Sequence, residues 1–167
     1  MANISLFIGR FQPFHKGHLS VIKGMVKVSD KVLIGIGSSN THGTPDDPFT
    51  REERREMIQR ALQEENIIPL YDVTFINLPD MPEEDEAWAK MCLEICENKV
   101  TTIWTGNEWT KKSFGSTGIK VQDIKEVPGI SATEVRRRLK VGENWKELVP
   151  EAVVDYLVEI DGVGRVK

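Results

Sequence analysis

Apolar residues along this chain form short continuous runs that alternate with stripes at helical spacing. The continuous runs predict buried strands, which we place at 4–9, 31–37, 72–77, 100–105 and 119–123. Between these runs, apolar residues recur three, four or seven positions apart, as in Leu19, Ile22 and Val26, and this spacing predicts helices. Strands that alternate with helices predict an α/β fold whose parallel sheet has helices on both faces.

Two capping pairs mark where helices begin. Thr50 with Glu53, and Ser131 with Glu134, have the spacing of a capping box, in which the cap residue and the third helical residue satisfy each other's backbone N–H groups. We expect helices over 16–28, after Thr50, over 88–95, after Ser131 and over 153–160. The loops that we expect to be functional by position are 10–15, 38–49 and 124–130.

Length and composition indicate an ordinary globular domain. At 167 residues, with no repeat or linker to divide it, the chain is expected to form a single domain over 1–167. The 22 basic and 26 acidic residues give a net charge of −4, which argues against general nucleic-acid binding. No apolar run approaches the ~20 residues of a membrane span. The N-terminus lacks the pattern of a signal peptide, so we expect a cytoplasmic protein.

Two cysteines, Cys92 and Cys96, lie four positions apart on a predicted helix. A zinc site needs further ligands, and the sequence places none near them. A disulfide between positions i and i+4 of a helix has poor geometry. Cys92 lies on the apolar stripe, which indicates packing, and Cys96 lies at its edge. We therefore predict no resident metal site.

The segment 9–18, GRFQPFHKGH, joins the first predicted strand to the first helix. In an open α/β sheet such a turn lies at the carboxyl end of a strand, where ligands bind. A helix N-terminus there presents free N–H groups and the positive end of a dipole, which suits phosphate. His15 and His18 lie on one face and can donate hydrogen bonds to phosphate oxygens. Gly17 leaves room for a ligand, and Pro13 stiffens the turn. The alternative is that the histidines only cap the helix.

A second segment, from Ser131 to Arg136, points to the same chemistry. Ser131 caps a helix whose first-turn amides can meet anionic oxygens, and Arg136 lies within reach of the same anion. The alternative is that Ser131, Thr133 and Glu134 only cap the helix while residues 136–138 are solvated. Combined with the histidine pair, the segment favours two helix N-termini that hold one polyphosphate. No GxxxxGK[ST] motif occurs, so the chain is not a P-loop enzyme.

These segments resemble the HxGH nucleotidyltransferase superfamily, and the full wording of 9–15 most resembles the archaeal-type nicotinamide mononucleotide (NMN) adenylyltransferases. Asp-Pro-Phe-Thr at 47–50, Trp-Thr-Gly-Asn at 104–107 and Ile-Ser-Ala-Thr-Glu-Val-Arg at 130–136 are similar to further motifs of that family. The resemblance covers almost the entire chain. It implies a single Rossmann-like domain with a five- or six-stranded parallel sheet.

The resemblance also implies the reaction. The 5′-phosphate of NMN would attack the α-phosphate of ATP, giving NAD and pyrophosphate without a protein nucleophile. The catalytic residues that it implies are Arg10, His15, His18 and Arg136, with Lys16 assisting from further away. The ATP-binding residues are expected to be Gly9, Arg10, Phe11, His15, His18, Gly106, Asn107, Ser131, Thr133 and Arg136. The residues expected to bind the acceptor are Phe14, Ser38, Ser39, Arg54 and Trp88, whose ring would stack on nicotinamide. Trp88 also heads an apolar helix stripe, so the alternative for it is core packing, and both roles can hold. The resemblance further implies Mg²⁺ as a bridge between phosphates, held mostly by substrate and water, and a homo-oligomer.

Three positions depart from the family pattern. The family has an arginine where this chain has Asp46, and commonly an asparagine where it has Asp85. The loop before the second phosphate motif carries basic residues and an aromatic in the family, whereas 126–130 reads EVPGI here. All three departures concern the acceptor rather than ATP. A sister enzyme with another phosphate acceptor, such as phosphopantetheine, or with CTP as donor, therefore stays open, as does a non-catalytic nucleotide-binding module.

Overall fold

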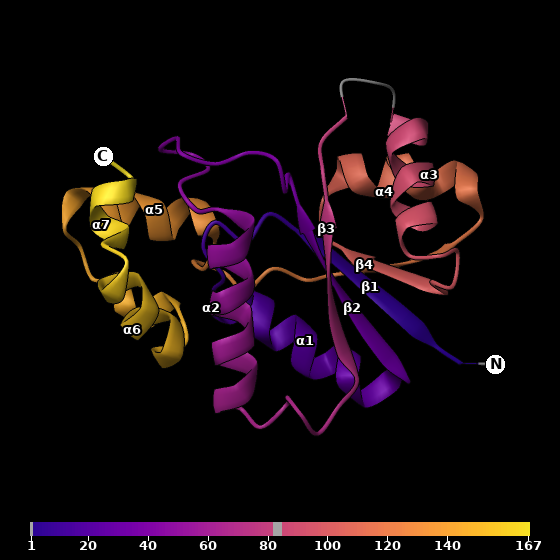
Figure 1. Cartoon of the computed structure of the whole chain (residues 1–167), viewed down its shortest axis with the longest axis horizontal. Helices are drawn as coiled ribbons and strands as arrows, with labels where there is room; N and C mark the ends of the chain where they lie inside the picture. The colour runs from indigo at the N-terminus through magenta and orange to yellow at the C-terminus, as the bar shows by residue number, and fades with distance from the viewer. Residues whose placement is uncertain (1, 82–84) are drawn as a thin grey trace.

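The fold is built around a parallel sheet, seen from the side in Figure 1. A computed structural model describes residues 2–81 and 85–167 of the chain. Within this part the strands are β1 (Ile4–Gly9), β2 (Lys31–Gly37), β3 (Val73–Leu78), β4 (Thr102–Thr105) and β5 (Lys120–Asp123). All neighbouring strands pair in parallel, in the order β3-β2-β1-β4-β5. The expectation of a five- or six-stranded parallel sheet is confirmed with five strands.

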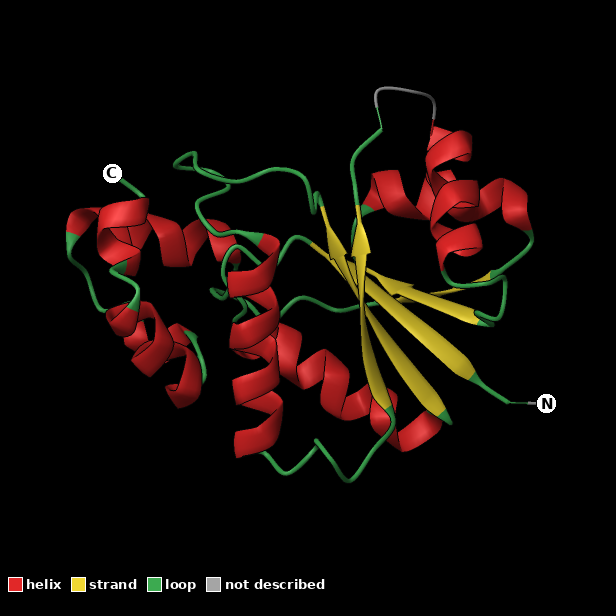
Figure 2. Cartoon of the chain, viewed as in Figure 1, coloured by secondary structure: helices red, strands yellow, loops and turns green. Residues whose placement is uncertain are grey.

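Helices follow the strands along the chain, as Figure 2 shows. They are α1 (Lys16–Val28), α2 (Arg51–Glu64), α3 (Asp85–Ile95), α4 (Glu108–Phe114), α5 (Ala132–Val141), α6 (Glu151–Glu159) and α7 (Gly162–Arg165). Two short 3-10 helices, η1 (Gly115–Thr117) and η2 (Lys146–Leu148), complete the set of helices that the structure describes. None of these helices has both the length and the apolar character that crossing a membrane would require.

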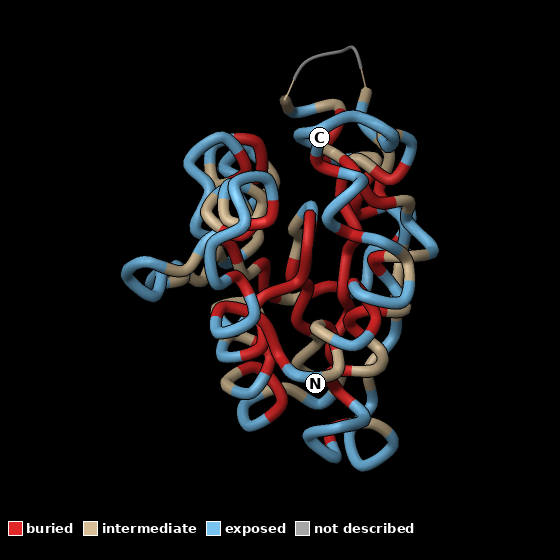
Figure 3. Tube along the Cα trace, turned by 90° about the vertical axis from the view of Figure 1, so that its left-hand side faces the viewer, coloured by how far each residue is buried: buried red, intermediate tan, exposed pale blue. Residues whose placement is uncertain are grey.

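Two apolar cores lie on the two faces of the sheet, because alternate strand residues point to opposite sides. On β1, Phe7 joins the core under α1, α2, α5 and α6, whereas Leu6 joins the core under α3 and α4. On β2, Ile34 and Leu33 divide in the same way. Figure 3 shows these buried segments running through the centre of the molecule. Helices on both faces make this a Rossmann-like fold.

The strand order reverses beside β1. The chain moves from β1 to β2 and β3 in one direction, then returns to place β4 on the other side of β1. The loops after β1 and β4 therefore leave the sheet in opposite directions and open a crevice at its carboxyl edge. Ligands bind in such crevices in doubly wound sheets. The 9–18 turn follows β1 and the Gly106-Asn107 pair follows β4, so both lie at this carboxyl edge of the sheet.

Local patterns predict most element boundaries. β1, β2 and α1 span the predicted residues, while β3 begins one residue later than predicted and β4 two residues later. The Thr50–Glu53 capping box is confirmed in both directions. The Ser131–Glu134 box is only half formed: Ser131 Oγ accepts the Glu134 N–H at 3.0 Å, but the Glu134 carboxylate accepts from arginines of the next turn. Two cations outcompete one backbone N–H for that carboxylate.

Candidate active site

A cavity of about 440 Å³ opens at the switch point of the sheet. Its walls come from the end of β1, the start of α1, the end of β4 and the loop that leads into α5. Of the predicted site residues it contains Gly9, His15, His18, Gly106, Asn107 and Ser131. Segments that are more than a hundred residues apart in the sequence therefore meet in one cleft.

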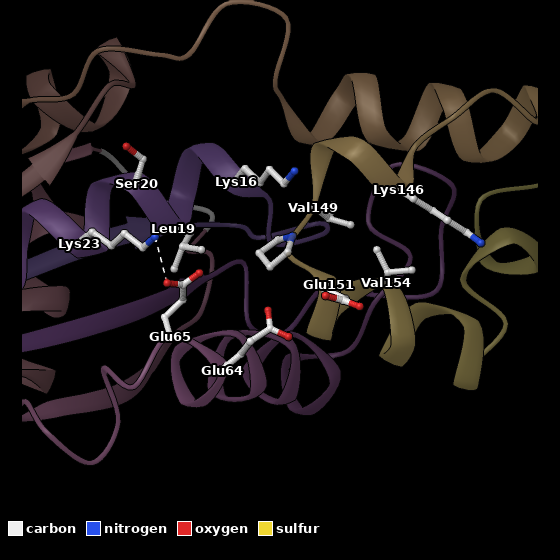
Figure 4. A pocket seen from close by; sticks show the side chains of 11 residues that line it. Lys16, Leu19, Ser20, Lys23, Glu64, Glu65, Lys146, Val149, Glu151 and Val154 are labelled. Atoms are coloured by element: carbon white, nitrogen blue, oxygen red, sulfur yellow. Dashed lines mark ion pairs between the residues drawn. The ribbon is translucent and has the colours of Figure 1, made fainter.

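A larger cavity, of about 670 Å³, lies between α1, the end of α2 and the start of α6 (Figure 4). Its polar lining mixes both charges, and an ion pair of 3.1 Å joins Lys23 to Glu65 across part of it. Lys16 lines this cavity and not the histidine cleft. Lys16 therefore lies outside the lining of the histidine cleft, and assistance from further away stays a prediction.

His15 and His18 cap α1 and line the cleft at the same time. His15 Nδ1 accepts the N–H groups of Gly17 at 3.0 Å and of His18 at 3.3 Å, while His18 Nδ1 accepts the His15 N–H at 3.1 Å. The two rings stack at 3.6 Å between centroids. A neutral imidazole that accepts at Nδ1 carries its proton at Nε2. Capping and ligand binding are therefore not alternatives, because the cap leaves each ring an outer N–H donor.

Both rings are uncharged at neutral pH. Burial lowers the pKa of His15 to about 4. The pKa of His18 lies well below its ordinary value because of burial and, secondarily, the proximity of His15. In the free protein the pair therefore offers hydrogen bonds rather than positive charge.

This arrangement predicts acid sensitivity. Because the folded pKa of His15 is depressed, its contribution to stability is complete above pH 6.5 and is lost as pH falls toward about 4. The loss for His15 amounts to at most about 3 kcal/mol in the free energy of unfolding. Denaturant melts of the wild type and of a His15→Asn, His18→Asn variant between pH 7 and 4 measure it. Asparagine can still cap the helix, so the free energy of unfolding of the variant should fall less between pH 7 and pH 4. If it fell as much as that of the wild type, the histidines would not be the source of the acid sensitivity.

Two glycines give the histidine turn its shape. A Cβ at Gly17 would lie 2.8 Å from the His15 ring, so glycine leaves room for the capping ring, and Gly17 also lines the cleft. A Cβ at Gly9 would lie 2.9 Å from the Phe11 ring, which lies beneath it and is 1% exposed. Gly9 lines the cleft, whereas the Phe11 ring fills the space of a Gly9 side chain and does not itself line the cleft.

Phe14 also supports the site from inside. It is fully buried, and its ring stacks on His18 at 5.5 Å between centroids. The family resemblance implies that Phe14 contacts the acceptor. In the structure no part of the Phe14 side chain reaches solvent, so Phe14 holds the His18 ring in place instead of contacting a ligand.

Arg10 and Arg136 bring two positive charges to the same region. Arg136 Nη1 donates to the Gln12 carbonyl at 2.7 Å, which ties α5 to the 9–18 turn. Arg10 forms a 2.6 Å ion pair with Asp47 and donates to the Asp46 carbonyl at 3.3 Å. Burial, followed by the charge of Arg10, lowers the pKa of Arg136. Two guanidinium groups that repel each other favour an anion between them.

The start of α5 and the end of β4 complete the nucleotide side of the cleft. Ser131 lines it and caps α5. Thr133 is exposed in the first turn of α5, and its Oγ1 accepts from Arg136 at 3.4 Å. The side-chain oxygen of Asn107 accepts a hydrogen bond from the Thr110 N–H at 3.1 Å. The Glu134 N–H donates to Ser131, so the donors that remain for a ligand are the first two backbone N–H groups of α5 and the Asn107 amide nitrogen.

Arg54, which the resemblance places in contact with the acceptor, instead supports the backbone around the site. It is fully buried, and its guanidinium donates to four backbone carbonyls, at distances of 2.7 to 3.2 Å, which belong to Arg10, Gly37, Ser38 and Thr50. Burial lowers its pKa to about 10. Arg54 thus joins the ends of β1 and β2 and cannot present its charge to an acceptor phosphate in this conformation. Its position on the apolar stripe, three and four residues before Met57 and Ile58, is the sequence signal for that burial.

The remaining acceptor candidates differ in exposure. Ser38 donates from its hydroxyl to Asp80 at 2.9 Å, and Ser39 is 4% exposed. Trp88 is 6% exposed because it packs in the core under α3 and α4, with the Phe114 ring at 5.7 Å and the Trp109 ring at 4.8 Å between centroids. Trp109 is 47% exposed and was not predicted as a site residue. Its one signal in the sequence is its position two residues after the Gly106-Asn107 motif.

Comparison with known proteins agrees with this geometry. The family model described as cytidylyltransferase-like matches residues 6–138. A nicotinamide-nucleotide adenylyltransferase from Thermococcus sibiricus is 41% identical over 164 residues, which cover 97% of this chain and 87% of the relative. A relative of the same name from Methanococcus vannielii is 38% identical, over 98% of this chain and 92% of its own.

Solved structures place the fold in the same group. A bifunctional NMN adenylyltransferase/ADP ribose pyrophosphatase from Francisella tularensis superposes with a TM-score of 0.77 at 29% identity, over 89% of this chain and 45% of that one. Its complex with AMP and a manganese ion gives a TM-score of 0.72 at 28% identity, over 96% and 50%. The chain thus spans about half of the Francisella protein. Together with the archaeal relatives, which align over nearly their full length, these matches show that the chain belongs to the cytidylyltransferase-like family, as a relative of the nicotinamide-nucleotide adenylyltransferases.

Proposed function

We propose that the protein transfers the adenylyl group of ATP to NMN, giving NAD and pyrophosphate. The observation that carries this proposal is the pair His15 and His18. Their inner nitrogens are held by the helix cap, so both outer N–H groups are fixed toward the cleft before any ligand arrives. Fixed donors stabilise charge that develops during a reaction without having to reorganise.

The chemistry requires no covalent intermediate with the protein. An oxygen of the acceptor's 5′-phosphate forms a bond to the α-phosphorus of ATP, and the bond from that phosphorus to the β-phosphate oxygen breaks. The electron pair leaves with pyrophosphate. His15 and His18 would donate to oxygens around the α-phosphorus, while Arg10 and Arg136 would take up charge on the leaving pyrophosphate. Ser131, Thr133 and the first amides of α5 would hold its terminal oxygens.

A divalent cation fits this site as a companion of ATP. Within residues 2–81 and 85–167, no group of three or more histidine, cysteine or acidic side chains is arranged to hold a metal ion. The predicted site residues that line the cleft instead offer mainly N–H donors, which suit phosphate oxygens. Mg²⁺ would therefore be held by the phosphates and water, and would neutralise part of their charge. The manganese ion in the Francisella complex supports a divalent metal but does not specify which one.

A panel of donors and acceptors tests the function. With ATP as donor and NMN as acceptor, we expect pyrophosphate and NAD to form in equal amounts. With phosphopantetheine as acceptor, we expect no pyrophosphate. With NMN, CTP should be a poor donor. A coupled pyrophosphate assay, with NAD measured separately, gives both products. The matched control is His18→Asn, which keeps a capping acceptor and should abolish most of the signal.

One observation keeps a second candidate in the panel. The family resemblance implies an arginine and an asparagine at the positions that Asp46 and Asp85 occupy in this chain, which points to a changed acceptor side. Pyrophosphate release with a different phosphate acceptor, and none with NMN, would establish a sister nucleotidyltransferase. Nucleotide binding without pyrophosphate release for any acceptor would indicate a non-catalytic module.

A cytoplasmic location and assembly into a homo-oligomer belong to the same proposal. Support for both comes from the resemblance to the archaeal enzymes and, for the location, from the sequence composition. Sedimentation of the purified protein with and without ATP would measure its state of assembly.

A further inference from the structure

Gln12 is a buried polar side chain in the middle of the 9–18 turn, with a relative exposure of 1%. Its amide forms two hydrogen bonds with the backbone of Phe49. Nε2 donates to the Phe49 carbonyl at 3.1 Å, and Oε1 accepts the Phe49 N–H at 2.9 Å. A buried amide that is satisfied on both sides fixes one arrangement of the two segments, because a shift would leave polar groups unpaired.

Phe49 is a rigid anchor for this amide. It is fully buried in the core under α1, α2, α5 and α6. The next residue, Thr50, caps α2 through the capping box with Glu53, and Arg54 Nε donates to the Thr50 carbonyl at 3.2 Å. Gln12 therefore joins the 9–18 turn to a helix start that is itself held by packing and by hydrogen bonds.

The turn needs contacts of this kind to keep its shape. Phe11 has a φ of +53°, in the left-handed region that residues other than glycine seldom adopt. Such a conformation persists where the surrounding structure determines it. Arg54 Nη1 donates to the carbonyl of Arg10, before Phe11, at 3.0 Å, and the Gln12 amide holds the residue after Phe11. Together these contacts fix the path of the backbone through residues 10–12.

The backbone of Gln12 in turn holds Arg136. The Gln12 carbonyl accepts a hydrogen bond from Arg136 Nη1 at 2.7 Å, while Arg136 Nη2 lies 3.4 Å from the Thr133 hydroxyl. A guanidinium group is planar and rigid, so a contact that fixes one of its nitrogens also limits the directions of the others. The position of the Gln12 carbonyl therefore decides where the remaining N–H donors of Arg136 point.

We propose that Gln12 is a positioning residue for adenylyl transfer. Its side chain anchors the turn on Phe49, and its carbonyl aims the Arg136 guanidinium at the leaving pyrophosphate. Because Gln12 is 1% exposed, it has no free surface for a substrate and acts through Arg136. This inference rests on the proposed function, in which Arg136 takes up charge on the pyrophosphate.

A double-mutant cycle on kcat tests the link between the two residues. Gln12→Met keeps the length of the side chain but removes both hydrogen bonds to Phe49. We expect it to lower kcat about 10- to 100-fold, the effect of a small misplacement of a group that acts in the transition state. The KM for ATP should change less than about 3-fold. In an Arg136→Ala background, Gln12→Met should lower kcat by less than about 2-fold, because the residue that Gln12 positions is gone.

Thr101→Val is the matched control. The Thr101 side chain also joins two backbone segments, since its Oγ1 accepts the Ile4 N–H at 3.0 Å, but it does so at the amino edge of the sheet. The control should melt at a lower temperature while it keeps kcat. Thermal melts define the range in which each variant is folded, and the kinetics are measured within it. If Gln12→Met does not fold, Gln12→Glu takes its place in the cycle, because it keeps the acceptor for the Phe49 N–H and loses the donor to the Phe49 carbonyl.

Calorimetric titration with inorganic pyrophosphate measures the same link without turnover. The Kd for pyrophosphate should rise several-fold in Gln12→Met and in Arg136→Ala. The double variant should bind pyrophosphate no more weakly than Arg136→Ala alone, because both changes remove the same contact.

The outcomes separate this inference from the proposed function. If the losses of Gln12→Met and Arg136→Ala multiply in the double variant, Gln12 does not act through Arg136 and the inference is wrong. If Gln12→Met melts earlier but keeps kcat, as Thr101→Val should, its role is structural and the inference is also wrong. If the wild type releases no pyrophosphate with any acceptor, the proposed function fails, and the pyrophosphate titration alone decides whether Gln12 positions Arg136.

Discussion

His18→Ala should lower kcat by about 10²–10³-fold, the usual effect of removing one fixed donor from a site where charge develops. The KM for ATP should change far less, because many other contacts hold the triphosphate. Steady-state kinetics at saturating NMN measure both constants. The structure supplies the reason for the size of the effect. The His18 ring is fixed by the His15 N–H on one side and by the Phe14 ring on its face.

Alanine removes a helix cap as well as a donor, so two further variants separate these roles. His18→Asn places an acceptor near the position of Nδ1 and keeps the cap, but has no donor near Nε2. It should therefore melt close to the wild type while remaining as inactive as alanine. His18→Gln can reach the Nε2 position and should recover part of kcat. If asparagine restored activity and glutamine did not, the donor at Nε2 would have no role.

The turn that carries this histidine could be predicted almost completely. The apolar run of β1, the stripe on α1 and the spacing of His15 and His18 are local properties of the sequence, and the structure places all of them as expected. What the spacing could not show is how the ring nitrogens are used. The same two histidines serve as cap and as donors, because each imidazole has two nitrogens that face opposite ways.

Long-range packing explains where the sequence was less informative. The family resemblance implies that Arg54 binds the acceptor, but α2 places it in the core, where it donates to four backbone carbonyls. α4 was not predicted because it has seven residues and is defined mainly by its Asn107 cap. Trp109 joins Trp88 only because β4 returns beside β1. Such contacts are set by topology rather than by periodicity.

Arg10 shows how the free protein differs from the state that must bind ATP. Its guanidinium is paired with Asp47 and with the Asp46 carbonyl, both in the loop after β2. The Arg10 side chain is 52% exposed and the Asp47 side chain 16% exposed, so water screens the pair mainly on the Arg10 side. A triphosphate carries more negative charge than one carboxylate and can displace Asp47 from Arg10. ATP binding would then free Asp47 from Arg10, while Gln12 continues to hold the end of the 38–49 loop through its two hydrogen bonds with Phe49.

Arg136→Lys should reduce kcat about 10²-fold although the charge is kept. The planar fork of Arg136 reaches the Gln12 carbonyl at 2.7 Å with one nitrogen and the Thr133 hydroxyl with the other, and lysine cannot span both. Its single ammonium would either hold the turn or meet the leaving pyrophosphate, but not do both.

Arg137→Ala and Arg138→Ala are the matched controls, because these neighbours pair with Glu134, Glu143 and Glu147 on the surface of the helix. They should keep kcat within about 2-fold and shift stability by less than about 1 kcal/mol. Equal losses at all three positions would mean that the helix contributes general positive charge, and that Arg136 has no specific part in the departure of pyrophosphate.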